Sequence, residues 1–486
     1  MLNAWETREI LKIGIEITTE KDKQRLLEKM LDKAIEISGC DAGTLYIVKD
    51  GKLHFAIMTT LSMHVHKGVG NEKIDLPPVE YTQGNVCAYA AIHRELVNIS
   101  NVYESEKFDF SGPKRYDGIT GYHTKSMLVI PMEDAEQKVI GVLQLINKLD
   151  KNGEIISFTD DDAFVLRSLG SMAAVSLSNM IYLEDIKHQM HSFVQAFATA
   201  VDKRTPYNGS HTRMVTKYAV LVARRLQELY ERGEGQEKFD NTLIEQLSLA
   251  AGLHDIGKMI IPLSVMNKST RLGNKIDTVN SRFQYLALLF ERDMLRGDIS
   301  EDDYLQRIAQ LEKDHNIILQ ADTAGFLTDD LLFGITALAD HRYVARDGTV
   351  IPYLTPDEQS CLSIRKGTLT ADERKVMESH AEMTESILEQ VYFIDSYEKV
   401  LKFASEHHEF LDGSGYPRGL SGDEISMETR ILTAVDIFDA LTCTDRPYKK
   451  PMPRARAIAI LQDMVKEGKL DGTVVDALDH ATRDFE

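Results

Sequence analysis

Features typical of secreted and membrane-spanning proteins are scarce in this sequence. Its 486 residues include four cysteines, which form no CxxC pair, so we expect reduced thiols and an intracellular protein. The first residues, MLNAWETREI, contain no apolar signal core, and the longest apolar runs have the length of strands, well short of the ~18 residues of a membrane helix. The sequence therefore predicts a cytoplasmic protein with no membrane insertion.

An excess of positive charge is also absent, because the formal net charge is −20 at pH 7. Proteins that bind nucleic acid without sequence preference present a basic face to the phosphates. The charge argues against that class, and we expect no nucleic-acid partner. A small anionic ligand in a local basic pocket is still compatible with this composition.

The chain is long enough for two or three domains, and its first third has the pattern of an α+β domain. Residues 6–38 have helical spacing, and the turn Lys49-Asp50-Gly51 between two strand-like runs indicates a hairpin. Strands are expected at GTLYIV (43–48), KLHFAIM (52–58), SMLVIPM (126–132) and VIGVLQLI (139–146).

A long helix is expected to follow this domain. It begins near Thr159, which is placed to cap it, and its apolar spacing continues to Val201, before Pro206. We predict one connector, although two helices with a kink would give the same pattern. An apolar stripe indicates a parallel homodimer, unless it packs onto its own domains; it consists of Ile181, Leu183, Ile186, Met190, Phe193 and Phe197.

Beyond Pro206 the pattern is nearly all helical, and it contains the residues that could perform chemistry. His407 and His408 are adjacent, although the chain has only 15 histidines. Other candidates lie in or beside apolar helical segments: His211, the His254-Asp255 pair, His380, Asp436 and Asp439. An unpaired carboxylate inside an apolar helix is costly, so this set favours a functional site over surface residues.

Imidazole and carboxylate together suit divalent Fe, Mn, Co, Ni and Zn. Asp255 could bridge two metals while His254 binds one, and two metals can activate a hydroxide and hold a phosphodiester. Gly257 allows the backbone to approach closely, and Lys258 offers a positive charge for a phosphate oxygen. Asp255 and Lys258 are therefore our candidate catalytic residues.

Three segments closely resemble the HD-GYP subgroup of HD-domain phosphohydrolases: HDIGK (254–258), HHEFLDGSGYPRGL (407–420) and DIFDALTCTDRPYKK (436–450). The resemblance covers about 190–268 and 366–450, including TPYNGSHTRMV. It implies a helical bundle that hydrolyses cyclic di-GMP to linear pGpG or GMP, with iron or manganese as the usual metal.

The resemblance also implies site residues. The metal ligands would be His211, His254, Asp255, His380, His407, His408 and Asp436. The substrate contacts would be Lys258, Tyr416, Arg446 and Lys449, and the glycine-rich turn would add Arg418. A phenol ring can stack on a guanine, and an arginine can bind a phosphate bidentately.

This sequence departs from the family pattern at two places. Some members have a glutamate four residues before the first histidine, associated with a third metal; here that residue is Tyr207, so we expect two metals. The loop from IPLSVMNKS to IRKGTLTADE is divided by a helical insertion at about 269–365. The insertion could be a lid, a partner surface or a dimer contact.

The first third resembles a GAF domain, through YHTKSMLVIPM (122–132) and IGVLQLINK (140–148). Asn147-Lys148 followed by FTDDD resembles the Asn-Lys…Phe…Asp-Glu pattern of cyclic-nucleotide phosphodiesterase GAF domains, with Ala163 in the last position. Such a domain could bind a small ligand or serve only for dimerisation.

We therefore expect a two-domain signalling enzyme. An α+β GAF domain at 1–182, an antiparallel sheet flanked by helices, would continue through a connector to about 204 and regulate an all-α HD-GYP phosphodiesterase at 190–486. Alternatives are a non-catalytic cyclic di-GMP receptor or interaction protein and a hydrolase of another cyclic dinucleotide or a phosphomonoester. An intact metal-ligand set argues against the pure receptor.

Overall fold

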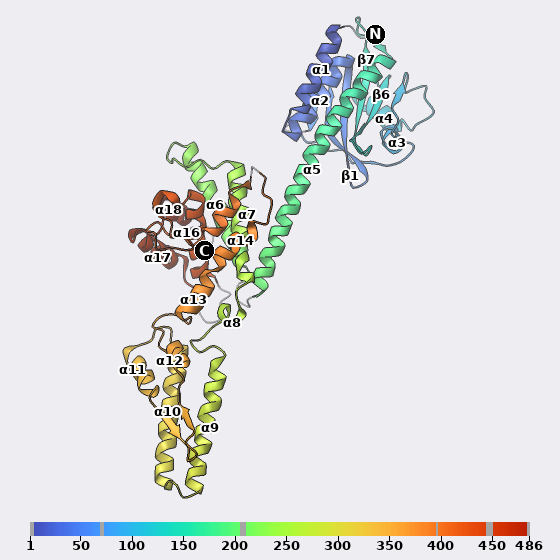
Figure 1. The fold of residues 1–486 in the computed structure, drawn as a ribbon. Coiled ribbons are helices and arrows are strands. Elements are labelled where there is room, and N and C mark those ends of the chain that lie inside the picture. Colours follow the sequence, from blue (N-terminus) through green and yellow to red (C-terminus); the bar gives the residue numbers. More distant parts are fainter. Residues whose placement is uncertain (1–3, 69–71, 205–209, 395–396, 444–450, 484–486) are drawn as a thin grey trace. The chain divides into compact units, whose positions relative to one another are not determined.

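The structure is a computed structural model, and it describes residues 4–68, 72–204, 210–394, 397–443 and 451–483. The chain divides into two compact units, Met1–Gln189 and Met190–Glu486, which are drawn in Figure 1. Each unit is described by itself.

The N-terminal unit is built on one antiparallel sheet with strand order β3-β2-β1-β7-β6-β5; β4 pairs with β2 and β8 with β7. The strands are β1 (Cys40–Lys49), β2 (Lys52–Thr60), β3 (Val65–Gly68), β4 (Val79–Glu80), β5 (Val97–Ile99), β6 (Met127–Glu133), β7 (Val139–Leu149) and β8 (Ile155–Ile156). The predicted hairpin is confirmed: β1 pairs with β2, and Asp50 and Gly51 both have positive φ.

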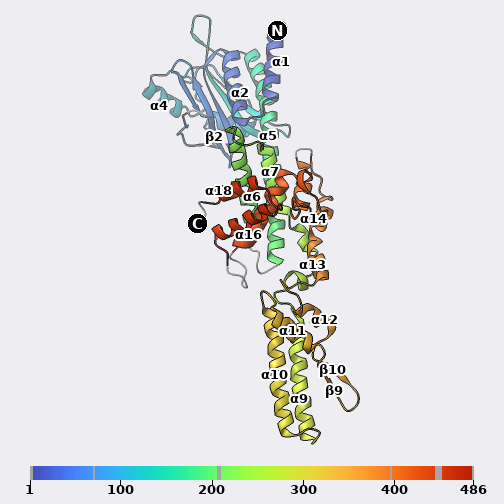
Figure 2. The same ribbon diagram turned by 90° about the vertical axis from the view of Figure 1, so that its left-hand side faces the viewer.

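Helices cover both faces of this sheet (Figures 1 and 2). They are α1 (Ala4–Thr18), α2 (Lys23–Ser38), α3 (Val86–His93), α4 (Ser111–Thr120) and α5 (Asp160–Arg204). One apolar core joins α1, α2 and the start of α5 to one face, and a second core joins α3 to the other. The predicted α+β fold is therefore confirmed.

The Asn147-Lys148 pattern has a structural role in this unit. The Asn147 side chain donates to the His123 carbonyl (2.7 Å) and accepts from the Lys125 N–H (2.8 Å). Lys148, at the end of β7, forms an ion pair with Asp162 in the first turn of α5. These residues attach the sheet to the start of the long helix.

Helix α5 is a single helix of 45 residues, as predicted. By length and composition it is the one helix of the described residues that could cross a membrane, a match that the sequence did not lead us to expect. However, 44% of the apolar window is buried within the protein, and core helices of soluble proteins pass the same test.

The C-terminal unit is helical. Its elements outside the insertion are α6 (His211–Glu231), α7 (Asn241–Leu253), η1 (Ile256–Met259), α8 (Leu263–Met266), α13 (Ala371–Glu378), α14 (His380–Leu388), α15 (Val400–Ser405), η3 (Gly422–Glu424), α16 (Met427–Thr442), α17 (Arg454–Lys466) and α18 (Gly472–Ala481). One core buries the inner faces of α6, α7, α15, α16, α17 and α18 against each other. The predicted helical bundle is confirmed.

The insertion has its own apolar core. Its elements are α9 (Lys275–Leu295), α10 (Glu301–Thr323), α11 (Asp329–Leu338), β9 (Arg342–Val344), β10 (Val350–Pro352) and α12 (Pro356–Leu362). The β9–β10 hairpin is an exception to the all-helical prediction. Thr368 donates to the carbonyl of Lys268 (2.9 Å), so the chain enters and leaves the insertion at nearly the same point.

Candidate metal centre

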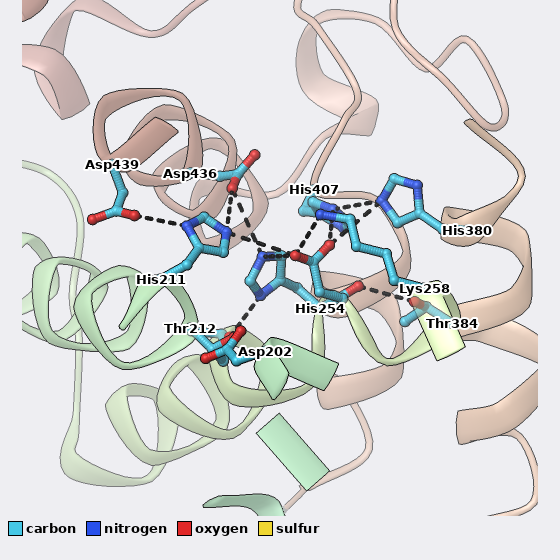
Figure 3. Close-up of polar contacts among 12 residues, drawn as sticks. Asp202, His211, Thr212, His254, Lys258, His380, Thr384, His407, Asp436 and Asp439 are labelled. Atoms are coloured by element: carbon cyan, nitrogen blue, oxygen red, sulfur yellow. Dashed lines mark hydrogen bonds and ion pairs between the residues drawn. The ribbon is translucent and has the colours of Figure 1, made fainter. Parts of the chain in front are cut away.

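Five segments of the C-terminal unit bring the seven predicted ligands together. His211 is the first residue of α6, His254 and Asp255 follow α7, His380 begins α14, His407 and His408 follow α15, and Asp436 lies in α16. Three groups with ligand atoms within 4.8 Å of one another contain all seven: His211, His254 and Asp436; His380, His407 and His408; and His254, Asp255 and His407. Figure 3 shows the first group and part of the second.

The turn that carries Asp255 is held against α14. A Cβ at Gly257 would lie 2.0 Å from the His380 carbonyl oxygen, so only glycine allows this approach. The buried Thr384 hydroxyl accepts from the Gly257 N–H (3.0 Å) and donates to the His254 carbonyl (2.9 Å). Two ligand segments separated by the insertion are thereby fixed to each other.

The two oxygens of Asp255 face different ligand sets. Oδ2 lies 3.6 Å from His211 Nε2 and 3.4 Å from His254 Nε2. Oδ1 lies 3.6 Å from His380 Nε2 and 3.9 Å from His407 Nε2. A carboxylate in this position can serve two metals at once.

Distances around the first set are those of a metal coordination shell. Asp436 Oδ1 lies 3.2 Å from His211 Nε2 and 3.7 Å from His254 Nε2 (Figure 3). Ligands at 2.0–2.2 Å from a metal are roughly 3.0–3.6 Å from each other. The ligand atoms therefore leave room for an ion between them.

In the second set, imidazole nitrogens face each other. His380 and His407 direct Nδ1 at the carbonyls of Met377 (2.6 Å) and Ala404 (2.7 Å). A carbonyl only accepts, so Nδ1 carries the proton and Nε2 has the lone pair. The two Nε2 atoms are 3.4 Å apart, and His408 Nε2 is 3.1 Å from that of His380. The lone pairs of His380 and His407 at this separation repel unless a cation lies between them.

Two buried atoms support the same conclusion. His254 Nε2 and Asp255 Oδ1 have no hydrogen-bond partner among the described residues. A buried polar atom without a partner costs about 1–3 kcal/mol. Coordination of a metal would satisfy both atoms, so the residues present fit a pair of divalent metals.

Protonation states agree with this fit for the second set. Burial and the nearby Lys258 ammonium lower the pKa of His380 to about 4, and burial lowers the pKa of His408 to about 3. At neutral pH these rings are uncharged, as metal ligation requires. Burial also lowers the pKa of His211, but the carboxylates of Asp255, Asp436 and Asp439 outweigh it and raise this pKa well above the ordinary value.

Asp439 was a candidate in the sequence, but we assigned it no role in the site. Its Oδ2 lies 2.7 Å from His211 Nδ1, and the carboxylate is buried (Figure 3). A carboxylate behind a ligating histidine fixes the ring and raises its basicity. The signal was present in the sequence, because Asp439 lies one helical turn after Asp436 on an apolar helix.

The glycine-rich turn packs on the histidine pair. The ring of Tyr416 lies 4.7 Å from that of His408, and its backbone N–H donates to the His408 carbonyl (3.2 Å). A Cβ at Gly415 would lie 2.4 Å from Phe410 N. The buried Glu409 carboxylate accepts the backbone N–H of Arg418 (2.7 Å), so it holds the turn. Tyr416 is therefore beside the second ligand set.

Arg418, which we predicted to meet a phosphate, is engaged by the protein's own carboxylates. Its Nη1 lies 2.8 Å from Glu406 Oε1, and its Nη2 forms an ion pair with Glu385 on α14. These ion pairs connect the turn to Glu385 on α14 and to Glu406 next to the histidine pair. Lys258 Nζ likewise lies 2.6 Å from Asp255 Oδ2.

Three residues named from the sequence lie outside the described part of the chain. They are Arg446 and Lys449, predicted to contact substrate, and Tyr207, at the position associated with a third metal. Their roles stay predictions.

Family comparisons agree with this division of the chain. Residues 22–177 match the GAF domain family, and residues 353–474 match the HD domain family. This chain contains a GAF domain and an HD domain. The HD-family match contains four of the seven ligands, and the other three precede the insertion.

Curated relatives of the chain are phosphodiesterases by name. A 3'3'-cGAMP-specific phosphodiesterase 3 of Vibrio cholerae serotype O1 is 46% identical over 20% of this chain and 21% of its own length. The cyclic di-GMP phosphodiesterase response regulator RpfG of Xanthomonas campestris pv. campestris is 41% identical over 24% and 30%. A dual 3',5'-cyclic-AMP and -GMP phosphodiesterase 11A of Takifugu rubripes is 29% identical over 35% and 18%. The chain spans about a fifth to a third of the length of these relatives.

Solved structures similar to this chain include GAF domains. That of Acinetobacter phosphoenolpyruvate-protein phosphotransferase aligns with 37% of this chain and 95% of its own length, at 16% identity and a TM-score of 0.30. We assign the GAF fold from the family match and from the sheet order of the chain itself.

Proposed function

We propose that the HD domain is a metal-dependent phosphodiesterase that hydrolyses cyclic di-GMP to linear pGpG, GMP or both. The observation that carries the proposal is the Asp255 carboxylate, whose two oxygens face two separate sets of ligands. A receptor that only binds a dinucleotide needs no such arrangement.

Two divalent metals, iron or manganese, would be held by His211, His254 and Asp436 on one side and by His380, His407 and His408 on the other. Five imidazoles and two carboxylates suit these borderline ions. When bound, the metals would supply Lewis acidity and a nucleophile at neutral pH.

The residues of the chain would orient the substrate. Tyr416 lies where a guanine could stack on its ring beside His408. Lys258 would offer its ammonium to a phosphate oxygen, and Arg446 and Lys449 would add cations. Arg418 already binds the Glu385 and Glu406 carboxylates, so a phosphate contact would use its remaining N–H donors or replace one of these ion pairs.

A second substrate class has specific support. One relative is named as specific for 3'3'-cGAMP, so another cyclic dinucleotide is the leading alternative to cyclic di-GMP. The two substrates differ in one base, and they share the phosphodiester bonds that the metal centre would cleave.

We further propose that the GAF domain, with or without a small ligand, regulates the HD domain in a cytoplasmic homodimer. Leu183, Ile186 and Phe193 on α5 are each about 60% exposed, and such an apolar stripe would be covered by the same helix of a second copy. Ile181 and Met190 instead pack partly against their own cores.

The test is turnover of cyclic di-GMP and 3'3'-cGAMP by protein purified anaerobically, with metal analysis on the same sample. We expect about two transition-metal ions per chain and conversion of at least one substrate to a linear product. Asp255→Ala is the control for cleavage by contaminants. Full metal content without turnover of either substrate would favour the receptor.

A further inference from the structure

The last turn of α5 contacts the helix that carries the first metal ligand. Asp202 is 8% exposed, and its Oδ1 accepts a hydrogen bond from the Thr212 hydroxyl at 2.9 Å. Thr212 is buried and directly follows His211 at the start of α6 (Figure 3). The position of His211 is therefore tied to the end of the connector.

The same turn also holds the segment that carries Asp255. Arg204 Nη1 donates to the carbonyl of Lys258 at 2.9 Å, and Nη2 donates to the carbonyl of Ile261 at 3.2 Å. Both carbonyls lie just after Asp255 in the chain. A planar guanidinium that reaches two carbonyls restrains direction as well as distance.

Apolar packing fixes only part of this end of the helix, where Val201 is buried. Val194 packs closely over Gly252 of α7. Further along, a cavity of about 360 Å³ lies among α5, α6 and α7, lined by Ala198, Thr199, Asp202, Thr216 and Ser248. Polar contacts on either side of the cavity therefore have a large share in setting where the helix ends.

We propose that Asp202 and Arg204 are positioning residues of the metal centre. Together they would set the distance between His211 Nε2 and Asp255 Oδ2, which is 3.6 Å here. A displacement of the helix end by about 1 Å would lengthen these hydrogen bonds beyond their useful range. The inference rests on the proposed metal centre and deepens it.

These contacts would provide a route by which the GAF domain regulates the metal centre. Helix α5 begins inside the GAF core, where Leu166 and Leu169 are buried, and continues without interruption to Arg204. A shift or rotation of the helix would reach both ligand segments through the contacts of its last turn. No separate relay element is needed.

The experiment compares Asp202→Ala, Thr212→Val, their double variant, Arg204→Met and Arg204→Lys in the full chain. Lys203→Gln, an exposed neighbour, is the matched control. Affinity for Mn²⁺ is measured by titration of metal-free protein. The values of kcat and KM are measured with cyclic di-GMP, and stability is measured by thermal unfolding without metal.

We expect a loss of about 10–100-fold in metal affinity or kcat, with little change in KM. The loss in the double variant should be no larger than in the more affected single variant, because Asp202→Ala and Thr212→Val remove the same hydrogen bond. Arg204→Lys should recover part of the loss, and Lys203→Gln should match the wild type.

Wild-type metal affinity and kcat in Asp202→Ala and Arg204→Met would overturn the inference. So would losses that merely follow a fall in unfolding temperature, or equal losses in Lys203→Gln. A wild-type protein that binds metal without turnover would contradict the proposed function alone, because the metal affinities of the variants would still test the positioning role. A wild type that binds no metal would defeat both.

Discussion

The hydroxyl of Thr384 offers a sharp test of how the metal centre is held together. It bonds the N–H of Gly257 and the carbonyl of His254, and all three groups lie in buried residues. Thr384→Val keeps the shape of the side chain but removes both hydrogen bonds. Thr384→Ser keeps the hydroxyl and removes one methyl group.

The losses of stability expected for the valine and serine variants differ enough to be distinguished. Each of the two buried backbone groups left without a partner costs about 1–3 kcal/mol, so valine should lower the free energy of unfolding by about 2–6 kcal/mol. Serine should lose about 1 kcal/mol for the methyl group. Because His254 and Asp255 are both proposed ligands, valine should also weaken metal binding about 10–100-fold.

The assay is calorimetric unfolding of metal-free protein, followed by Mn²⁺ titration. The transition that rises in temperature when Mn²⁺ is added identifies the HD domain, because a ligand stabilises the state that binds it. A valine variant as stable as the wild type, or a serine variant as damaged as valine, would refute the reasoning.

Four further predictions follow from the same structure. Asp255→Ala should lose both metals and hydrolysis; full metal content with wild-type turnover would exclude the bridge. Tyr416→Ala should raise KM about tenfold with metal content unchanged, whereas Tyr416→Phe keeps the ring; equal kinetics in all three proteins would remove the stacking role. Burial of the Glu358 carboxyl tends to raise its pKa, but Arg282 and the Thr355 N–H outweigh burial and lower the pKa below its ordinary 4.5. The wild type should therefore be more stable than Glu358→Gln by about 2 kcal/mol at pH 7, and this difference in the free energy of unfolding should shrink as the pH falls below 4.5. Thermal unfolding at several pH values measures the difference, and a value that stays constant would contradict the prediction. Light scattering should show a dimer that Ile186→Asp weakens, and a monomeric wild type at micromolar concentration would end that proposal.

Local patterns in the sequence were sufficient for most elements, and the resemblance to a family supplied the candidate ligands. The period of apolar residues predicted α5, and the turn residues Asp50 and Gly51 predicted the first hairpin. The seven ligands lie in motifs short enough to be read directly. Their convergence could not be derived from spacing, because His211 and Asp436 are distant in the chain and are joined by helix packing alone.

The partners of the supporting side chains could not be identified from the sequence. Thr384 contacts Gly257 across 127 residues, and Asp439 contacts His211 across 228. A threonine or aspartate at such a position has no local pattern that marks its partner. For Arg418 the motif suggested a phosphate contact, which stays a prediction, and the structure adds two carboxylate partners that the sequence did not indicate.

The insertion also affects the order in which the site is made during translation. His211, His254 and Asp255 leave the ribosome before residues 269–365, and the other four ligands leave after them. At roughly 5–20 residues per second, the two halves are separated by about 5–20 s. The insertion can fold on its own core in that interval, while the nascent chain exposes three metal ligands without their partners. If the proposed metal centre forms in the cell, the timing of translation would therefore affect its loading as much as the chemistry of its ligands does.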